Sequence, residues 1–183
     1  MKQVSLRGKK WIYKNFDHEN VNFIKENFSL DEITAKLLSI RNINIDNINS
    51  FLKPSIKNLI PNPNVLKDMS KSIDRIYKAI HKKEKIGIFG DYDVDGASST
   101  ALLTKYFLSI NQKVITYIPD RHKDGYGPSV TGFNNLINKG SKIIFTVDCG
   151  TMSFKPISLA QKLEIDVIVL DHHQSDTKIP NAC

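Results

Sequence analysis

The sequence predicts an α/β fold in which helices cover both faces of a parallel, Rossmann-like sheet, with a small helical annex in front. From residue 85 onward, short apolar runs alternate with amphipathic stretches. The apolar runs are rich in β-branched residues and do not alternate with polar ones, which is typical of strands covered on both faces. Before residue 65 the spacing is helical, without a strand pattern. The 183 residues, of which 40% are hydrophobic, suffice for one core and a small annex.

The annex is expected to consist of short helices over residues 17–60. Its clearest helical spacing is that of four apolar residues, Ile33, Leu37, Leu38 and Ile40. Residues 54–64 predict a turn-rich linker because three prolines interrupt them, Pro54, Pro61 and Pro63. We therefore expect a helical, basic annex with its linker over residues 1–65 and the α/β domain over residues 66–183.

A longer amphipathic helix is predicted between the linker and the first strand, in the stretch DMSKSIDRIYKAIHKK. Its apolar stripe consists of Met69, Ile73, Ile76, Tyr77 and Ile80. Asp68 or Ser70 is expected to cap the helix, because both side chains can accept hydrogen bonds from the free N–H groups of the first turn.

Four strands and three helices are expected to alternate after this helix. The strands cover residues 85–90, 113–119, 142–147 and 166–170, and the intervening helices cover residues 97–110, 131–140 and 154–164. In parallel sheets of this kind, ligands bind at the carboxyl ends of the strands. The residues that follow each strand are therefore the first place to look for function.

Acidic residues follow three of the four predicted strands. The segments are Asp91-Tyr92-Asp93-Val94-Asp95-Gly96, Asp148-Cys149-Gly150 and Asp171-His172-His173. In an extended backbone, residues i and i+2 point the same way roughly 6–7 Å apart, so Asp91, Asp93 and Asp95 are expected on one side. Clustered carboxylates either have raised pKa values or are neutralised by a cation. Together with an imidazole, such a set suits Mn²⁺ or Mg²⁺.

Each of these segments also has an ordinary structural interpretation. A single aspartate after a strand is commonly a helix N-cap, and paired histidines are commonly surface residues. The hexapeptide that begins at Asp91 matches the start of a calcium-binding EF-hand loop, but Leu102 stands where that loop needs a glutamate. Three acidic strand ends in one sheet favour a metal site over these alternatives.

Three segments in this order, GDYDVDG, VDCGT and DHH, resemble the first three motifs of the DHH phosphoesterases. Within that family, DYDVDGASST, YIPDRHKDGYGPS and FLKPSIKNLIPNPNVLKDM resemble the RecJ-type exonucleases, and the likeness covers nearly the whole chain. The resemblance implies 5′-to-3′ hydrolysis of phosphodiester bonds in single-stranded DNA with two divalent cations, Mn²⁺ or Mg²⁺. It also implies a role in DNA repair and recombination, alongside repair or recombination proteins that are not identified.

The resemblance further implies a role for each motif residue. Asp93 would bind one cation and Asp95 the other, Asp148 would bridge the two, and His172 would complete the second site. Such a pair of cations stabilises both the attacking and the leaving oxygen. No nucleophile from the protein would then be needed.

Further motif residues are implied at the same site. His173 would face the scissile phosphate, and Asp91 and Asp171 would orient the ligands by hydrogen bonds or balance their charge. Ser98 and Ser99 are expected to begin the helix after the first motif. There they would either offer free backbone N–H groups to a phosphate or cap the helix.

The segment after the second strand predicts substrate contacts at the same edge. Family resemblance supports phosphate binding by Arg121, for which a guanidinium is suited. Tyr126 is a candidate for stacking on a base, although a lone tyrosine is more often a packing residue. Gly125 and Gly127 are expected to take positive φ in a structural turn.

The sequence departs from the family pattern after the third motif. DHH enzymes carry a fourth motif with an aspartate, and RecJ-type chains carry a second α/β domain over the cleft. Neither is found in the ten residues after His173. We therefore expect an N-terminal fragment with an incomplete second cation site, which would bind metal more weakly and not be fully active by itself.

The net charge of +7 and the pI near 9.3 suit a polyanionic partner. Positive charge is concentrated in residues 1–14 and 71–85, although a solvated helix face explains the second run equally well. The chain has neither a run of about 18 apolar residues nor an apolar N-terminal segment, so we expect a soluble, cytoplasmic protein without membrane contact. Cys149 and Cys183 are expected to stay reduced.

Three other functions stay open. The first is a different DHH enzyme, such as an inorganic pyrophosphatase or a nuclease of short oligonucleotides. The second is a phosphotransferase of haloacid-dehalogenase type, which the segment from Asp93 to Ala97 resembles, although it offers no role for His172 and His173. The third is a module that binds single strands without cutting them.

Overall fold

The computed structural model describes residues 5–10, 12 and 14–182. Lys2 of the basic N-terminal run and Cys183 lie outside the described residues. The chain forms two compact units, residues 1–62 and residues 63–183. The domain limits at residues 65 and 66 stay a prediction, since compactness alone does not define a domain that folds independently.

The first unit is helical, as predicted. Its elements are α1 (His18–Phe28), α2 (Glu32–Ile40), a 3-10 turn (Ile45–Asn47), α3 (Ile48–Leu52) and α4 (Ile56–Leu59). Asp17 and Asp31 cap the first two helices by accepting hydrogen bonds from N–H groups of the first turn. The core of this unit is made of Val21, Ile24, Ala35, Leu38 and Ile48. Ile33 and Leu37 of the predicted stripe are exposed, so α2 buries a neighbouring face instead.

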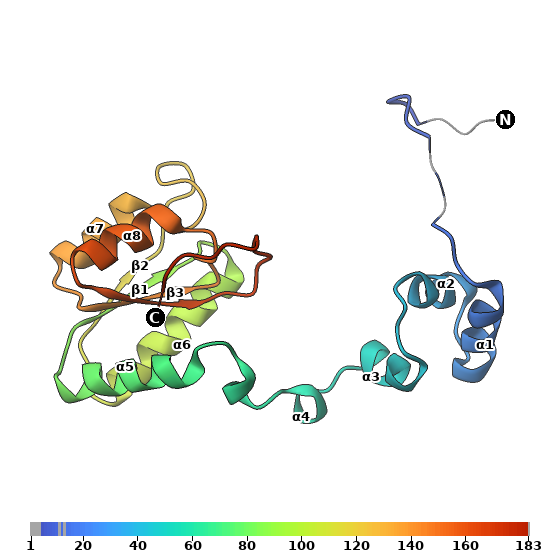
Figure 1. Ribbon diagram of the computed structural model, residues 1–183, viewed down its shortest axis with the longest axis horizontal. Coiled ribbons are helices and arrows are strands. Elements are labelled where there is room, and N and C mark those ends of the chain that lie inside the picture. The colour runs from blue at the N-terminus through green and yellow to red at the C-terminus, as the bar shows by residue number, and fades with distance from the viewer. Residues whose placement is uncertain (1–4, 11, 13, 183) are drawn as a thin grey trace. The chain divides into compact units, whose positions relative to one another are not determined.

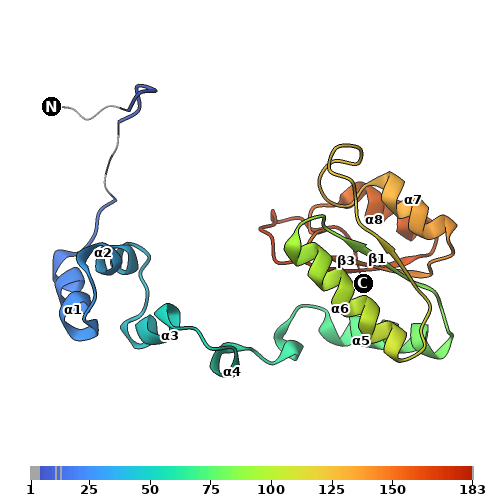
Figure 2. The same cartoon turned by 180° about the vertical axis from the view of Figure 1, so that it is seen from behind.

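The second unit is built on a four-stranded, all-parallel sheet with the strand order β2-β1-β3-β4. The strands are β1 (Ile86–Gly90), β2 (Val114–Tyr117), β3 (Ile143–Val147) and β4 (Asp166–Leu170). The helices are α5 (Met69–His81), α6 (Val94–Ser109), α7 (Val130–Asn138) and α8 (Phe154–Lys162), and a 3-10 turn (Pro63–Val65) precedes them. Helices α7 and α8 cover one face of the sheet, and α5 and α6 cover the other (Figure 1 and Figure 2). The predicted α/β fold is confirmed.

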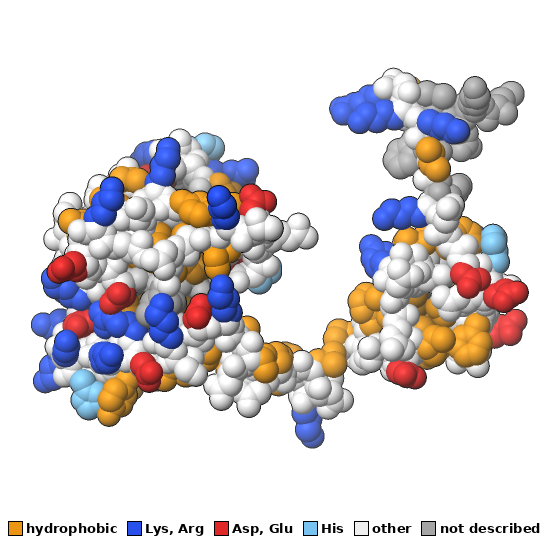
Figure 3. All heavy atoms as spheres, in the orientation of Figure 1, with side chains coloured by type: hydrophobic (Ala, Val, Ile, Leu, Met, Phe, Trp, Pro, Cys, Tyr) orange, Lys and Arg blue, Asp and Glu red, His pale blue; other side chains and the backbone are white. Residues whose placement is uncertain are grey.

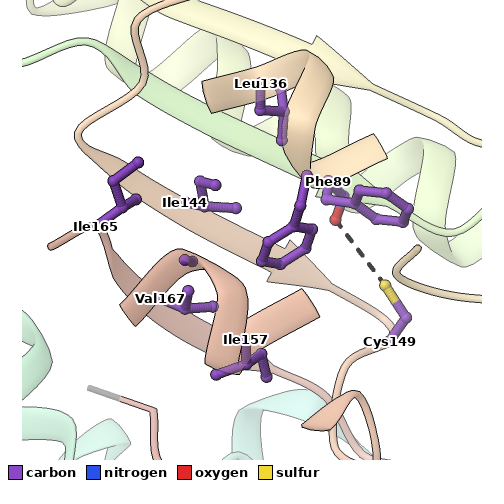
Figure 4. Close-up of a cluster of buried hydrophobic side chains, with 9 residues drawn as sticks. Phe89, Leu136, Ile144, Cys149, Ile157, Ile165 and Val167 are labelled. Atoms are coloured by element: carbon purple, nitrogen blue, oxygen red, sulfur yellow. Dashed lines mark hydrogen bonds between the residues drawn. The ribbon is translucent and has the colours of Figure 1, made fainter. Parts of the chain in front are cut away.

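Strands β1 and β3 are buried along their whole length, because each lies between two other strands and both faces of the sheet are covered. Alternate residues face opposite sides. Phe89, Ile144 and Val167 pack under α7 and α8, as Figure 4 shows, and Ile88 and Phe145 pack under α5 and α6. Burial of each such side chain contributes roughly 1.5–3 kcal/mol. Within the described residues, no helix combines the length and the apolarity that crossing a membrane requires.

Cys149 belongs to the core under α7 and α8. Its Sγ lies 3.9 Å from the carbonyl oxygen of Phe89, the contact drawn as a dashed line in Figure 4. Burial raises the pKa of this thiol, and the nearby carboxylates of Asp91 and Asp171 raise it further. Cys149 is therefore a buried, free thiol that packs, as expected.

Helix α5 packs on the sheet with a face that differs from the predicted stripe. Ile76, Ala79 and Ile80 contact the core, whereas Ile73 and Tyr77 are exposed. The two faces overlap in helical spacing, so sequence periodicity alone does not distinguish them. In the structure, the face of α5 that carries the small residue Ala79 is the one that packs on the sheet.

The capping predicted for α5 is wrong. Asp68 occupies the N-cap position with a φ of 57°, and within the described part of the chain its side chain makes no capping hydrogen bond. Ser70 lies inside the first turn of the helix. The left-handed backbone at Asp68 departs from the extended conformation that an N-cap side chain normally needs.

Arg75 ties α5 to the end of the sheet opposite the acidic strand ends. One Nη lies 2.7 Å from Glu84 Oε2, and Nε pairs with Asp166, the first residue of β4. Lys85 Nζ donates to the carbonyl oxygen of Lys139 at 2.7 Å. Arg75 and Lys85, both in the basic run of residues 71–85, thus serve the fold. On the face seen in Figure 3, blue basic side chains of this unit are interspersed with red acidic ones.

Candidate metal centre

The carboxyl ends of β1, β3 and β4 meet at one edge of the sheet, as predicted. In register, Gly90 lies beside Val147, and Val147 lies beside Leu170. The backbone N–H of Asp91 donates to the Val147 carbonyl at 3.3 Å, and that of Asp148 donates to the Leu170 carbonyl at 2.8 Å. The sheet itself therefore holds the residues that follow these strands side by side.

Two groups of side chains at this edge bring potential metal-ligand atoms within 4.8 Å of one another. The groups are Asp148, His172 and His173, and Asp91, Asp93 and Asp148. Asp148 belongs to both. Carboxylate oxygens and imidazole nitrogens are donors that Mn²⁺ accepts together, and carboxylates also suit Mg²⁺. The donor chemistry therefore fits divalent cations of this kind.

The expectation of an extended backbone through Asp95 is wrong. Helix α6 begins at Val94, so Asp95 lies in its first turn and, among the described residues, belongs to neither group. Asp93 is the N-cap, and its Oδ1 accepts a hydrogen bond from the Gly96 N–H at 3.0 Å. The chain turns this early because Gly96 lets the helix approach the backbone of Asp91, which a Cβ at Gly96 would overlap. The ligand role of Asp95 stays a prediction.

The early start of α6 also changes the place of Ser98 and Ser99. Both lie in the second turn, where backbone N–H groups bond within the helix and are not free for a ligand. Ser99 Oγ donates to the carbonyl oxygen of Asp95 at 2.7 Å. The expectation that these serines begin or cap the helix is wrong. Substrate contact through their hydroxyl groups stays a prediction.

Asp148 is buried and has an unusual backbone. Its φ of 59° lies in the left-handed region, and its side chain is 7% exposed. Burial raises the pKa of its carboxyl, and the neighbouring Asp93 raises it further. Oδ1 lies 3.1 Å from Nε2 of His172, whose side chain is 78% exposed. A bound cation would relieve the repulsion between these acids.

His173 is oriented by a chain of hydrogen bonds. Its Nδ1 lies 2.7 Å from Asp171 Oδ1, which also accepts from the His173 backbone N–H at 3.1 Å. Asp171 Oδ2 accepts from the backbone N–H of Thr151 at 2.9 Å and from its hydroxyl at 2.6 Å. Burial alone would raise the pKa of Asp171, but the bonds from Thr151 and His173 lower it to about 2. Sequence reasoning missed Thr151, although it ends the segment VDCGT.

Aromatic rings extend the site away from His173. Tyr126 Oη lies 3.5 Å from His173 Nε2. The Tyr92 ring meets the Tyr126 ring edge-on at 6.3 Å, and the Arg121 guanidinium lies over the Tyr92 ring at 5.4 Å. Arg121 and Tyr126 thus lie beside the candidate metal centre, and both contact Tyr92, a residue for which sequence reasoning had no role.

The turn between β2 and α7 has the structure that its glycines predict. Gly125 and Gly127 have φ values of 80° and 70°. Asp124 closes the turn, because its Oδ2 accepts from the Tyr117 hydroxyl and from the Asp120 backbone N–H, each at 2.9 Å. The positive φ values are confirmed.

Two hollows open at this edge of the second unit. One, of about 690 Å³, lies between the start of α5 and β4, and the other, of about 610 Å³, lies beside Tyr126 and the start of α8. Thr151, Asp171 and His173 line both. His173 therefore stands between two spaces that are open to a ligand.

The sheet is parallel, its strand ends carry two groups of candidate ligands, and both groups include Asp148. This arrangement is typical of phosphoesterases that use two cations. Residues 85–183 match the family described as DHH family, N-terminal domain. The chain belongs to the DHH family, and its second unit contains a RecJ-like DHH phosphoesterase domain. The resemblance of the three motifs is thereby confirmed, and the haloacid-dehalogenase alternative loses its support.

Curated relatives of the chain are single-stranded-DNA-specific exonucleases named RecJ. The chain is 33% identical to that of Bacillus subtilis over 94% of its own length, and 36% identical to that of Escherichia coli over 72%. The matches cover 22% and 23% of those proteins. The chain therefore spans about a fifth of the length of these relatives.

Solved structures with a similar fold contain manganese. A crystal structure of exonuclease RecJ bound to manganese has a TM-score of 0.60 and 28% identity, over 64% of this chain and 30% of that one. A structure of RecJ from Thermus thermophilus in complex with Mn²⁺ has a TM-score of 0.59, over 90% of this chain and 22% of that one. The identity to the second is 21%, so that likeness shows the fold alone.

Proposed function

We propose that this chain carries the DHH motifs of an enzyme that hydrolyses phosphodiester bonds of single-stranded DNA in the 5′-to-3′ direction, using two divalent cations, Mn²⁺ or Mg²⁺. The observation that carries the proposal is that Asp148 belongs to both groups of candidate ligands. A carboxylate between two cations is the centre of a two-metal site. The exonuclease activity named for the relatives and the manganese in a solved RecJ structure support the same conclusion.

In this proposal the four ligands have the roles that their motif positions imply. Asp93 binds one cation, Asp95 binds the other, Asp148 bridges them and His172 completes the second site. The short distances from Asp148 to Asp93 and to His172 support this assignment, whereas the assignment of Asp95 rests on its motif position alone. When bound, the cations lower the pKa of a water molecule and neutralise charge on the phosphate.

Asp91 and Asp171 orient the site. Asp91 Oδ1 accepts from the backbone N–H of Tyr92 at 2.7 Å, which braces the turn that carries Asp93. Asp171 Oδ1 accepts a hydrogen bond from Nδ1–H of His173, and this bond directs the other ring nitrogen toward the substrate side. The bond to Asp171 raises the pKa of His173, which favours an imidazolium next to an anionic phosphate.

The DNA strand lies along the edge where the two hollows open. Arg121 binds a backbone phosphate, for which its guanidinium is suited. Tyr126, whose side chain is 64% exposed, offers a ring on which a base can stack. Ser98 and Ser99 contribute hydroxyl groups from the adjacent helix.

Degradation of a 5′-labelled single-stranded oligonucleotide in Mn²⁺ or in EDTA tests the proposal. We expect metal-dependent release of the 5′ label, little cutting of a duplex of the same sequence, and no cutting by an Asp148→Ala variant. Hydrolysis of pyrophosphate or of dinucleotides alone would identify a different DHH enzyme. Strand binding in EDTA without cutting in Mn²⁺ would identify a binding module.

A further inference from the structure

We infer that Tyr92 is a positioning residue that holds Arg121 and Tyr126 in place for the DNA strand. The Arg121 guanidinium lies over the Tyr92 ring at 5.4 Å, and the Tyr126 ring meets it edge-on at 6.3 Å and 85°. One ring therefore contacts both residues of the β2–α7 loop that the proposed function assigns to the substrate. The inference depends on that function for the identity of the ligand.

Tyr92 is suited to this role because its own position is fixed. It follows the buried Asp91, and its backbone N–H donates to Asp91 Oδ1 at 2.7 Å. Asp93, the next residue, caps α6. The Tyr92 ring thus projects from a short link between a strand and a helix, and it is half-buried.

The two residues that contact Tyr92 are held less firmly by their own loop. Asp124 closes the base of the loop through Tyr117 and Asp120, but Tyr126 lies beyond that closure between two glycines with positive φ. Arg121 is exposed and, in the part of the chain that the structure describes, forms no ion pair. The Tyr92 ring is therefore the contact that orients Arg121 while its nitrogens stay available for a phosphate.

The same ring also links the loop to the metal centre. The Tyr126 ring contacts Tyr92, and the Tyr126 hydroxyl lies 3.5 Å from Nε2 of His173. Arg121, Tyr92, Tyr126 and His173 thus form a continuous row of contacts. A phosphate on Arg121 is consequently held at a defined distance from the candidate ligands, which is the condition for aligned hydrolysis.

The geometric part of the inference is testable without DNA. The side-chain Nε–H signal of Arg121 in an NMR spectrum should be shifted by the aromatic ring current of Tyr92. Tyr92→Phe keeps the ring and should keep the shift, whereas Tyr92→Leu should abolish it. Tyr106→Leu, at an exposed tyrosine of α6 outside the site, is the matched control and should leave the signal in place. An unshifted Arg121 signal in the unmodified chain would overturn the inference.

The functional part is tested by the affinity for a 5′-phosphorylated single strand, measured by fluorescence anisotropy in a double-mutant cycle. Tyr92→Leu should weaken binding roughly two- to fivefold, the factor that corresponds to an exposed cation–π contact. Tyr92→Phe should bind like the unmodified chain. In an Arg121→Ala background, Tyr92→Leu should weaken binding by a smaller factor, because the contact is already lost.

The outcomes separate the inference from the proposed function. Equal factors in both backgrounds would show that Tyr92 acts independently of Arg121 and would overturn the positioning role. If the unmodified chain binds no single strand, the proposed function fails, and the NMR signal still decides whether Tyr92 orients Arg121. A variant that loses the dispersed spectrum of the folded chain is replaced by Tyr92→Met, which removes the ring and fills similar space.

Discussion

Asp148 reaches both groups of candidate ligands because its backbone turns sharply at the end of β3. The strand pairs with β4 up to Val147, and the left-handed φ of Asp148 then redirects the chain while its N–H still bonds to Leu170. A non-glycine residue in this region is uncommon and carries a conformational cost. At the residue scale, the site therefore depends on one carboxylate in a strained position.

Replacing Asp148 with alanine should reduce Mn²⁺ affinity more than about 100-fold, because it removes the carboxylate that both groups share. Isothermal titration calorimetry measures the change. Asp74→Asn on the exposed face of α5 is the matched control and should bind Mn²⁺ like the unmodified chain. Unchanged affinity in Asp148→Ala would remove the bridging assignment.

Replacing Asp171 with asparagine should lower the pKa of His173 toward 6.5, because the hydrogen bond to Asp171 is the largest cause that raises it and the charge of Asp171 adds to it. Because the pKa of His173 is higher in the folded than in the unfolded state, this histidine stabilises the fold fully at pH values below its unfolded-state pKa. The stabilisation is lost as the pH rises through its folded-state pKa. That loss should be smaller in the variant. A ¹⁵N NMR titration of the metal-free chain measures the pKa, and Thr151→Ser, which keeps both donors to Asp171, should leave it unchanged.

At the scale of elements, the start of α6 decides which acids lie together. Asp91 and Asp93 flank the half-turn between β1 and α6, and the helix then carries Asp95 into its first turn. This geometry requires glycine at position 96, where the helix contacts the backbone of Asp91. The strand-to-helix turn is thus the element that shapes the candidate centre.

Replacing Gly96 with alanine should destabilise the fold by about 1–3 kcal/mol, because the added methyl group would overlap the backbone of Asp91. Mn²⁺ affinity should fall with it, since Asp91 and Asp93 would move apart. Urea denaturation and calorimetry measure the two effects. Ala101→Ser, on the exposed face of α6, is the control and should change the free energy of unfolding by no more than about 0.5 kcal/mol. Equal stability of the two variants would contradict the close packing at Gly96.

At the scale of the whole molecule, net charge is a weaker guide than the placement of single cations. The chain has a net charge of +7, but Arg75 and Lys85 of the basic run are engaged in the fold. Acidic and basic side chains are also interspersed on the face of the second unit seen in Figure 3. Strand binding is therefore expected to depend mainly on contacts at the sheet edge.

Replacing Arg121 with alanine should weaken single-strand binding and reduce the slope of log affinity against log salt by about 0.7, the value for one phosphate contact. Lys78→Gln and Lys82→Gln remove the same charge from exposed positions on or beside α5 and should change the slope less. Anisotropy titrations at several salt concentrations measure the slopes. An unaltered slope in Arg121→Ala would return this residue to a structural role.

Much of the fold was predictable because its signals are local. The β-branched runs placed all four strands, and the acids after three of them predicted the edge where candidate ligands gather. The errors concern tertiary contacts. The buried face of α5 and the start of α6 both depend on what packs against the helix, which the spacing of Ile73 or Ser98 does not encode.

The sequence by itself determined the class of fold, the family and the residues available for chemistry, since strand patterns and short motifs lie within a few consecutive residues. Only the tertiary structure decided that Asp148 is shared between two groups, that Thr151 donates to Asp171, and that Arg121 lies over the ring of Tyr92. The partners in these contacts are 20 or more residues apart in the chain. The parallel sheet brings them together because its strands align their carboxyl ends, and no local pattern specifies which side chains then meet.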